Sequence, residues 1–323
     1  MKKVLVTGIA GFIGSQLARQ LLLKGVEVIG VDNLNDYYDP LLKRHRLQAL
    51  RSEFDLQFQQ LDIESASDLE ALFLKNKFDV IFNLAARAGV GYSMVNPQVY
   101  FTTNVMGTLN LLQLMVRFSV PKIVLASTSS VYAGEPLPFH EDAPVNRPIS
   151  PYAASKKAAE QICYTYHYHF GIDCTVVRYF TVFGPAGRPD MSILRFIRWI
   201  DEGTPIELFG DGTQTRDFTY VEDIARGTVL AGAKAGYEIV NLGGGREPVS
   251  LNHMIQYIEK HLQKRAKINS KAALKADIKD TRADIGKAAR LLGWKPEIDF
   301  WRGLDLTLEW YMKNREFVLK LRL

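Results

Sequence analysis

Short apolar runs alternate with helical periodicity through the first half of the chain. Val4–Thr7 is an apolar run that ends at a glycine, as a buried parallel strand does. Apolar residues then recur with helical spacing over Phe12–Lys24, and Gly25 marks the end of that helix. Further strands are predicted at Val26–Asp32, Leu56–Leu61, Val80–Leu84, Ile123–Ala126 and Cys174–Arg178, and helices at Pro40–Arg51, Val99–Phe118 and Pro151–Phe170. This alternation predicts an α/β fold with a doubly wound parallel sheet.

The pattern becomes irregular after Tyr179. Glycine and proline punctuate residues 183–189, and further glycines separate only short elements beyond them. We therefore predict two domains, residues 1–179 and a smaller α/β domain of residues 180–323. Part of residues 216–240 is expected to return to the first sheet.

Composition and charge describe a folded protein without a nucleic-acid partner. Hydrophobic residues make up 47% and charged residues 23% of the 323 residues, which excludes disorder as the main state. The excess of 40 Lys and Arg over 35 Asp and Glu is only +5, which suits anionic small molecules. The densest basic run, residues 43–46, is interpreted as a solvated helix face.

Cysteine usage and hydropathy place the chain in a cell compartment. Two cysteines, Cys163 and Cys174, exclude a disulfide framework and favour a reducing environment. No Cys/His cluster has the spacing of a zinc site, so no metal is expected. No apolar stretch approaches the roughly 18 residues that a membrane span needs. The sequence predicts a cytoplasmic protein with no membrane partner.

A glycine-rich loop follows the first strand. Residues 8–14 read GIAGFIG, and their glycines let the backbone turn tightly and approach a diphosphate at the helix N-terminus. Asp32 ends the second strand, 24 residues after Gly8, where a carboxylate accepts ribose hydroxyls. No arginine follows Asp32 directly, which favours NAD over NADP. The alternative is a tight strand–helix turn, but the context favours a Rossmann-type cofactor site.

Tyr152 and Lys156 form the sharper chemical signal. Of 14 tyrosines, Tyr152 alone has a lysine four residues later. Ser150 and Pro151 are a good N-cap and first helical residue, so the pair lies on one face of a helix opening. A phenol with a pKa of about 10 is too weak a base near neutral pH, and a nearby ammonium lowers that pKa. The alternative is a surface aromatic–cation pair.

Hydroxyl groups follow the strand that precedes this helix. Residues 127–130 read STSS, directly after an apolar strand. The carboxyl ends of strands in such sheets face the ligand crevice, where a hydroxyl can hydrogen-bond a sugar oxygen. The residues alone leave open which of the four hydroxyls acts, or whether they form only a polar turn.

With these motifs, the whole chain resembles the extended short-chain dehydrogenase/reductase superfamily of nucleotide-sugar epimerases and dehydratases. Residues 178–185, RYFTVFGP, are similar to the family's RYFxVYGP, and residues 187–191, GRPDM, resemble the UDP-glucuronate 4-epimerases most closely. The resemblance implies a catalytic set of Tyr152, Lys156 and Thr128. It implies NAD contacts from Gly8, Gly11, Phe12, Ile13, Gly14, Asp32, Asn33, Asp62, Ile63, Leu84, Ala85, Ala86, Asn104, Tyr152, Lys156 and Tyr179. It implies UDP-sugar contacts from Thr128, Thr181, Arg188, Phe209, Arg216 and Asp277.

The resemblance also implies the reaction. We expect 4-epimerisation of a UDP-sugar, with Arg188 and Thr181 on a uronate carboxylate. Ser129 and Ser130 stand where dehydratases carry an Asp-Glu pair and where decarboxylases carry a glutamate, which disfavours both reactions. The chain also departs from the AGVRYS of uronate epimerases, because position 91 is Gly91 and an arginine stands earlier, at Arg87.

The sequence also leaves two alternative functions open and predicts an oligomeric state. UDP-glucose or UDP-N-acetylglucosamine 4-epimerisation is the main alternative, and a non-catalytic NAD-sensing module is the alternative from another class. We expect a homodimer, because Val99–Phe118 and Pro151–Phe170 carry more apolar residues than one sheet contact requires. His167 and His169 are interpreted as packing or interface residues rather than metal ligands.

Overall fold

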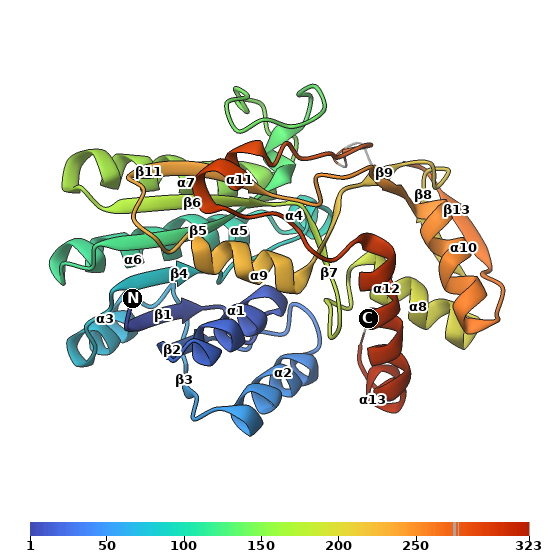
Figure 1. Cartoon of the computed structure of the whole chain (residues 1–323), viewed down its shortest axis with the longest axis horizontal. Helices are drawn as coiled ribbons and strands as arrows, with labels where there is room; N and C mark the ends of the chain where they lie inside the picture. The colour runs from blue at the N-terminus through green and yellow to red at the C-terminus, as the bar shows by residue number, and fades with distance from the viewer. Residues whose placement is uncertain (274–275, 277, 323) are drawn as a thin grey trace.

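A sheet of seven parallel strands organises the protein. The structure is a computed structural model that describes residues 1–273, 276 and 278–322. The strand order is β11-β6-β5-β4-β1-β2-β3, and every neighbouring pair is parallel (Figure 1). The strands are β1 (Lys3–Thr7), β2 (Glu27–Asp32), β3 (Gln57–Gln60), β4 (Val80–Asn83), β5 (Lys122–Thr128), β6 (Asp173–Tyr179) and β11 (Tyr237–Leu242). The doubly wound parallel sheet predicted from the sequence is confirmed.

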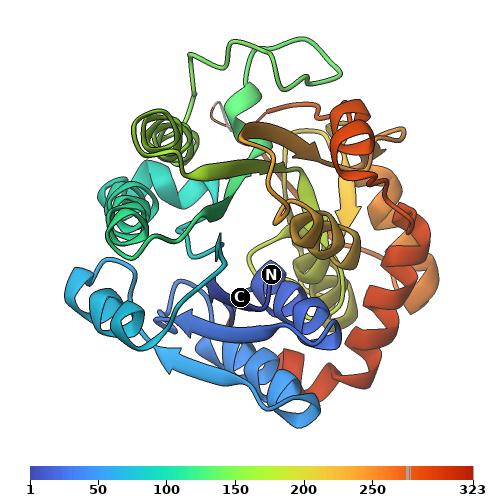
Figure 2. The same ribbon diagram turned by 60° about the vertical axis from the view of Figure 1, so that its left-hand side comes forward.

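Helices cover both faces of this sheet (Figure 2). Successive strand residues point to opposite faces, so Val4 and Val6 of β1 pack on one side while Leu5 packs on the other. The first side is covered by α1 (Phe12–Leu23), α2 (Pro40–Glu53), α9 (Val221–Leu230) and α11 (Gly286–Leu292). The second side is covered by α3 (Ala66–Lys75), α6 (Gly107–Arg117) and α7 (Pro151–Phe170). Both cores consist of fully buried aliphatic residues, which is the main source of stability in such a fold.

The single helix predicted over Val99–Phe118 is wrong in detail. A short α4 (Val90–Val95) is followed by α5 (Gln98–Phe101), a π-helical turn at Thr102–Met106 and then α6. A π-helical turn inserts one extra residue into a helix and often occurs at functional sites. Here it contains Asn104, which is almost fully buried. Hydrophobic periodicity does not reveal such a turn, because the apolar stripe continues on both sides of it.

The remaining elements form a second cluster beside the sheet. Helices α8 (Ser192–Glu202), α10 (Leu251–Leu262), α12 (Phe300–Lys313) and α13 (Arg315–Leu319) share a separate apolar core. Three two-stranded ribbons pair β7 (Thr181–Phe183) with β10 (Phe218–Tyr220), β8 (Ile206–Phe209) with β13 (Ile268–Lys271), and β9 (Thr215–Arg216) with β12 (Val249–Ser250). Between them the chain returns to the large sheet as β11, beside β6. The domain boundary at residue 179 stays a prediction.

The strand order fixes where a ligand lies. The order reverses between β1 and β4, and ligands of open α/β sheets bind outside the carboxyl ends of the strands at that point. The segments that follow β1, β2, β4 and β5 contain most of the residues singled out in the sequence.

Candidate active site

One threonine ties together the two strands at the reversal point. The Thr7 hydroxyl donates to Asn83 Oδ1 at 2.7 Å and accepts the backbone N–H groups of Leu84 and Ala85 at 3.1 and 3.0 Å. Gly8 follows Thr7 with a φ of +70°, and a Cβ there would lie 2.7 Å from the Ala85 nitrogen. The glycine loop therefore lies directly against the turn that contains Leu84, Ala85 and Ala86.

The glycine loop closes tightly on its own backbone at the N-terminus of α1. Cβ atoms placed on Gly11 and Gly14 would lie 2.9 and 2.1 Å from the Gly8 carbonyl oxygen, so the loop can close only with glycines. Gly11 caps α1 without a side-chain hydrogen bond, and Phe12 and Ile13 open that helix. The first N–H groups of a helix lack intrahelical partners and favour an anion. The loop fits the diphosphate of a dinucleotide.

Asp32 lies beside this loop at the end of β2. Its carboxylate accepts the N–H groups of Ala10 at 3.1 Å and Leu34 at 2.8 Å. Burial raises the pKa of Asp32, whereas the charge of Lys43 and these N–H groups lower it. Asn33 donates to Asp62 at 2.7 Å, and the next residue, Ile63, is buried beneath them. The structure therefore brings together Asp32, Asn33 and Asp62, three of the residues predicted to contact NAD.

The interpretation of residues 43–46 as a solvated face is wrong for two of the four. Lys43 and Arg46 are 5% and 4% exposed. They lie on the face of α2 that also buries Leu47 and Leu50, a 3-4-7 spacing visible in the sequence. Arg46 donates to the carbonyls of Ala10 and Ala186 at 3.2 and 2.7 Å. The basic residues thus face the glycine loop rather than solvent.

Tyr152 and Lys156 lie at the opening of α7, beside the end of β5. Ser150 accepts the N–H of Ala153 at 3.2 Å and caps this helix. The Tyr152 side chain lies near Thr128, whose hydroxyl donates to Ser130 Oγ at 3.1 Å. The Lys156 ammonium donates to the Ala126 carbonyl at 2.9 Å. These contacts bring the three predicted catalytic residues into one cluster, in which Thr128 and Lys156 are buried and Tyr152 is partly exposed.

Burial dominates the acid–base properties of this cluster. It raises the pKa of Tyr152, while the hydrogen bond to Thr128 and the charge of Arg188 lower that pKa. The sequence analysis expected the Lys156 ammonium to lower it, but here that ammonium is directed to the Ala126 carbonyl. Burial lowers the pKa of Lys156 to about 8, against the opposing charge of Glu160.

Glu160 is a buried residue of this site that the sequence analysis missed. It is fully buried one turn beyond Lys156, and it accepts the Ser127 hydroxyl at 2.6 Å. Arg178 donates to both its oxygens, at 3.0 and 2.8 Å. The Ser127 hydroxyl is thereby engaged in the core, which removes one of the four candidate hydroxyls; the choice of Thr128 as the catalytic one stays a prediction. The spacing of Tyr152, Lys156 and Glu160, four residues apart on one helix face, was the available signal.

Asn104 links the π-helical turn to the end of β4. Its side chain accepts the Arg87 N–H at 2.9 Å and donates to the Arg87 carbonyl at 3.0 Å. It also donates to the Ser155 hydroxyl on α7 at 2.9 Å. Asn104, predicted as an NAD contact, thus fixes the backbone of the loop that follows β4.

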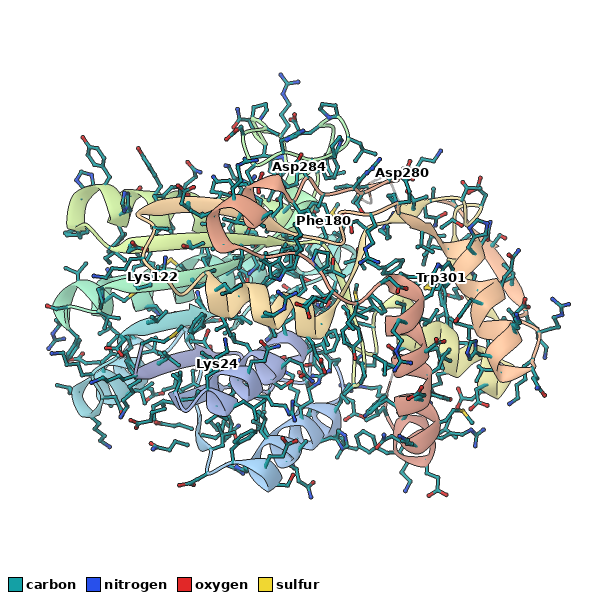
Figure 3. The ribbon with its side chains drawn as sticks, in the orientation of Figure 1. Lys24, Lys122, Phe180, Asp280, Asp284 and Trp301 are labelled. Atoms are coloured by element: carbon teal, nitrogen blue, oxygen red, sulfur yellow. The ribbon has the colours of Figure 1, made fainter. Side chains whose placement is uncertain are left out.

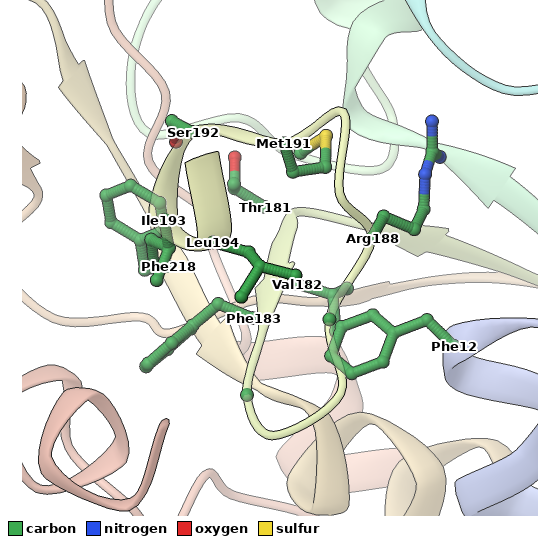
Figure 4. Close-up of a pocket in the computed structure, with 12 residues that line it drawn as sticks. Phe12, Thr181, Val182, Phe183, Arg188, Met191, Ser192, Ile193, Leu194 and Phe218 are labelled. Atoms are coloured by element: carbon green, nitrogen blue, oxygen red, sulfur yellow. The ribbon is translucent and has the colours of Figure 1, made fainter. Parts of the chain in front are cut away.

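Arg188 lies in the loop after β7 and is held from two sides. Asp190 accepts its Nε and Nη2 at 3.0 and 2.5 Å, and the ring of Tyr37 lies 5.7 Å from its guanidinium carbon. Thr181 and Arg188 line one hollow together with Phe12 and Met191, and the Arg188 side chain extends away from Thr181 (Figure 4). The structure places the two residues in one segment without joining their side chains.

Other predicted residues lie apart from Tyr152. The Tyr179 hydroxyl bonds Thr228 at 2.9 Å inside the core, so only its backbone, opposite Thr128, borders the site. Phe209 ends β8, and Arg216 donates to the Lys279 carbonyl at 2.7 Å. Residues 280–284 cross near Phe180, which packs against Ala283 (Figure 3). Asp277, predicted at the uridine ribose, lies outside the described residues.

The described residues give no sign of a metal centre or a membrane span. No group of three or more His, Cys, Asp and Glu side chains in residues 1–273, 276 and 278–322 could hold a metal ion. No helix in that part of the chain combines the length and apolarity needed to cross a bilayer.

Comparison with known proteins identifies the family. The profile of the NAD dependent epimerase/dehydratase family matches residues 4–243. A UDP-glucuronate 4-epimerase from Thermodesulfobacterium geofontis is 54% identical over 318 residues, 98% of each chain. The structure of a UDP-glucuronic acid 4-epimerase from Bacillus cereus in complex with UDP-glucuronic acid and NAD matches with a TM-score of 0.90 and 39% identity, over 96% of this chain and 99% of that one.

A relative named for a neutral sugar is also similar. The structure of a UDP-glucose 4-epimerase from Thermotoga maritima with UDP-glucose matches with a TM-score of 0.88 and 31% identity, over 97% of this chain and 99% of that one. The parallel sheet, the glycine loop at its reversal point and the buried Tyr152 cluster agree with these matches. The chain belongs to the NAD-dependent epimerase/dehydratase family.

Proposed function

We propose that this protein interconverts UDP-glucuronate and UDP-galacturonate by NAD-dependent epimerisation at carbon 4. The observation that carries the proposal is that Tyr152 lies near Thr128 at the carboxyl end of β5, where Thr128 and the charge of Arg188 both lower the pKa of Tyr152. The glycine loop and Asp32 fit the cofactor, as their geometry showed. The names of the relatives from Thermodesulfobacterium geofontis and Bacillus cereus support the choice of sugar.

Tyr152 is the base of the proposed reaction. As phenolate it removes the proton of the sugar 4-hydroxyl, and Thr128 holds the same oxygen and steadies the proton. NAD held by the glycine loop and Asp32 would supply a reversible hydride acceptor for carbon 4 of the sugar. Thr128 and the charge of Arg188 lower the pKa of Tyr152 and so favour its phenolate form, and the protonated Lys156, held by the Ala126 carbonyl, adds a positive charge one helical turn away. The reaction has no net oxidation, so the chain retains its cofactor through each cycle.

Arg188 is the proposed recognition group for the uronate. A guanidinium has five N–H donors, and Asp190 engages two of them, which leaves others for a second carboxylate. The transient 4-keto uronate is a β-keto acid that readily loses carbon dioxide. A charge-assisted hydrogen bond from Arg188 would hold the carboxylate in an orientation that disfavours this loss.

A neutral sugar is the second candidate, because Arg188 is already neutralised by Asp190. A substrate without a carboxylate would therefore meet no unpaired buried charge there. The similarity to the Thermotoga maritima UDP-glucose 4-epimerase supports the same alternative. Dehydratase and decarboxylase chemistry is disfavoured, since Ser129 and Ser130 cannot serve as acids or bases near neutral pH.

The proposal is tested by adding UDP-glucuronate to the purified protein and following the sugar proton couplings by NMR. UDP-glucose and UDP-N-acetylglucosamine run in parallel as substrates without a carboxylate. UDP-galacturonate that forms without added NAD supports both the reaction and the retained cofactor. Turnover of a neutral sugar alone would contradict the uronate assignment, and no turnover of any UDP-sugar would contradict the enzyme.

We also propose a homodimer in a reducing compartment such as the cytoplasm. α6 and α7 pack side by side, and α7 exposes Tyr164, Tyr168 and Phe170, with Tyr168 at 72% exposure. Such an aromatic face supports a helical interface with a second copy. Cys163 and Cys174 are free and buried, which supports a reducing compartment. Sedimentation at micromolar concentration that detects only the 36.5 kDa species would contradict the dimer.

A further inference from the structure

Arg87 has a buried donor atom without a partner. Its Nε has no hydrogen-bond acceptor in the part of the chain that the structure describes. Buried polar atoms are nearly always satisfied by protein, water or a ligand, and an unpaired donor on a charged group is especially costly. The Arg87 side chain therefore has an edge, Nε and Nη2, that is suited to an external acceptor.

The course of this side chain places that edge over the cofactor loop. Asn104 fixes the Arg87 backbone at the end of β4, on both its N–H and its carbonyl. At the other end, Nη1 donates to Asn35 Oδ1 at 3.3 Å, in the loop that follows β2. Because β1 lies between β4 and β2 in the sheet, Arg87 spans the carboxyl end of β1, where the glycine loop begins.

The charges around Arg87 favour an anion. Lys43 shares the same acceptor, Asn35 Oδ1, at 3.2 Å. Burial, together with the charges of Arg87, Arg46 and Arg188, lowers the pKa of Lys43 to about 8, against the opposing charge of Asp32. The two nearby carboxylates are already engaged, Asp190 by Arg188 and Asp32 by backbone N–H groups. Among the described residues no carboxylate forms an ion pair with Arg87, so positive charge is in excess at this groove.

We propose that Arg87 clamps a diphosphate in this groove, from the side opposite the N-terminus of α1. The free Nε and Nη2 edge forms the planar fork that matches two phosphate oxygens. Both NAD and the UDP-sugar contain a diphosphate. We assign the cofactor, because Arg87 shares the acceptor Asn35 with Lys43, in the loop that directly follows Asp32 and Asn33, two of the residues predicted to contact NAD. The inference rests on the cofactor of the family and not on the identity of the sugar.

The test measures cofactor retention in the full-length holoenzyme. Bound NAD is quantified after gel filtration, and its dissociation rate is followed during dilution. Arg87→Met keeps the apolar stem without the charge, Arg87→Lys keeps the charge without the fork, and Arg117→Met is the control, since Arg117 is exposed and pairs with Glu70. UDP binding to each NAD-saturated variant is measured by calorimetry.

We expect Arg87→Met to release NAD about tenfold faster or more, and Arg87→Lys about threefold faster, because a charge-assisted bidentate contact is lost or reduced to one point. Arg117→Met should match the parent protein, and UDP affinity should stay within about twofold in all variants. Unchanged NAD release in Arg87→Met would overturn the proposal. Weakened UDP binding with unchanged NAD release would assign Arg87 to the substrate diphosphate and overturn the cofactor assignment. Where Arg87→Met does not fold, the release rate of Arg87→Lys decides.

Discussion

Glu160 and Arg178 form a bidentate ion pair in the core, at 3.0 and 2.8 Å, one helical turn beyond Lys156. The pair joins α7 to β6, and the Ser127 hydroxyl adds β5 to the same network. The helix that carries Tyr152 and the strand end that carries Thr128 are thus fixed to each other by charged hydrogen bonds rather than by apolar contact alone.

Removing one partner of this pair should destabilise the protein strongly. Glu160→Gln leaves the Arg178 guanidinium buried without a counter-charge, which typically costs about 3–5 kcal/mol of unfolding free energy. Glu53→Gln is the matched control, because Glu53 pairs with Arg19 on the surface, where such pairs contribute about 1 kcal/mol or less. Urea denaturation of both variants measures the difference. Equal losses of unfolding free energy in the two variants would show that the buried ion pair contributes no more to stability than the surface pair.

Tyr152→Phe should abolish epimerisation while the cofactor stays bound. Loss of a general base reduces turnover by about 10²–10⁴-fold. Thr128→Ala should lose a large part of the activity, because it removes the hydroxyl that bonds Tyr152. Ser130→Ala should lose little. NMR-detected turnover measures all three, and a greater loss in Ser130→Ala than in Thr128→Ala would reverse the assignment of the hydroxyl.

The pKa of Lys156 gives the activity an alkaline limit. Burial lowers this pKa to about 8, so the ammonium that the proposed reaction uses is lost as the pH rises through that value. Turnover should therefore fall above about pH 8. A kcat that stays flat from neutral pH to well above 9 would contradict the role of the ammonium.

The same group should affect stability in the opposite direction. Its folded pKa lies below the ordinary 10.5 of a free lysine, so between these values the unfolded state binds more protons than the folded state. The contribution of Lys156 to the free energy of unfolding therefore rises with pH in this window. Denaturation of Lys156→Met at several pH values should show a smaller rise than the parent protein shows.

Gly14→Ala should destroy cofactor binding. Its Cβ would lie 2.1 Å from the Gly8 carbonyl oxygen, so the loop could not keep its shape. Gly91→Ala is the control, because a Cβ there meets nothing within 4 Å and α4 gains a better helix former. NAD content after gel filtration and the melting temperature measure both variants. Normal NAD content in Gly14→Ala would show that the loop can open without loss of the site.

Part of this architecture could be predicted from the sequence, and the physical reasons differ by element. β1 and α1 were identifiable because a continuous apolar run and a 3.6-residue period are local signals that end at glycines. Pro151–Phe170 matched α7 at both ends, since Ser150, Pro151 and Gly171 are local capping signals. The π-helical turn at Thr102–Met106 was not identifiable, because one extra backbone residue leaves the side-chain pattern almost unchanged.

The site divides in the same way. The Tyr152–Lys156 spacing and the glycine loop are local, and the structure brings both to the expected edge of the sheet. The surroundings of Arg87 depend on Asn35, Lys43 and Asn104, which come from three separate segments. No local sequence pattern predicts that residues from three separate segments contact one another. For the same reason, the basic residues 43–46 resemble a solvent-exposed helix face until the loop that packs against them is known.

The hydrogen bonds of Arg46 join the two halves of the chain, which matters for chimeras made between relatives. Its guanidinium donates to the carbonyls of Ala10 in the cofactor loop and of Ala186 and Gly187 in the loop that carries Arg188. A chimera that exchanges the second half of the chain would replace two of these three acceptors while it keeps the arginine. Such a chimera should acquire the donor's sugar preference only where the new loop places its backbone carbonyls within hydrogen-bond distance of the Arg46 guanidinium. The sugar specificity of such a chimera thus depends on Arg46, which has no role in the proposed chemical steps.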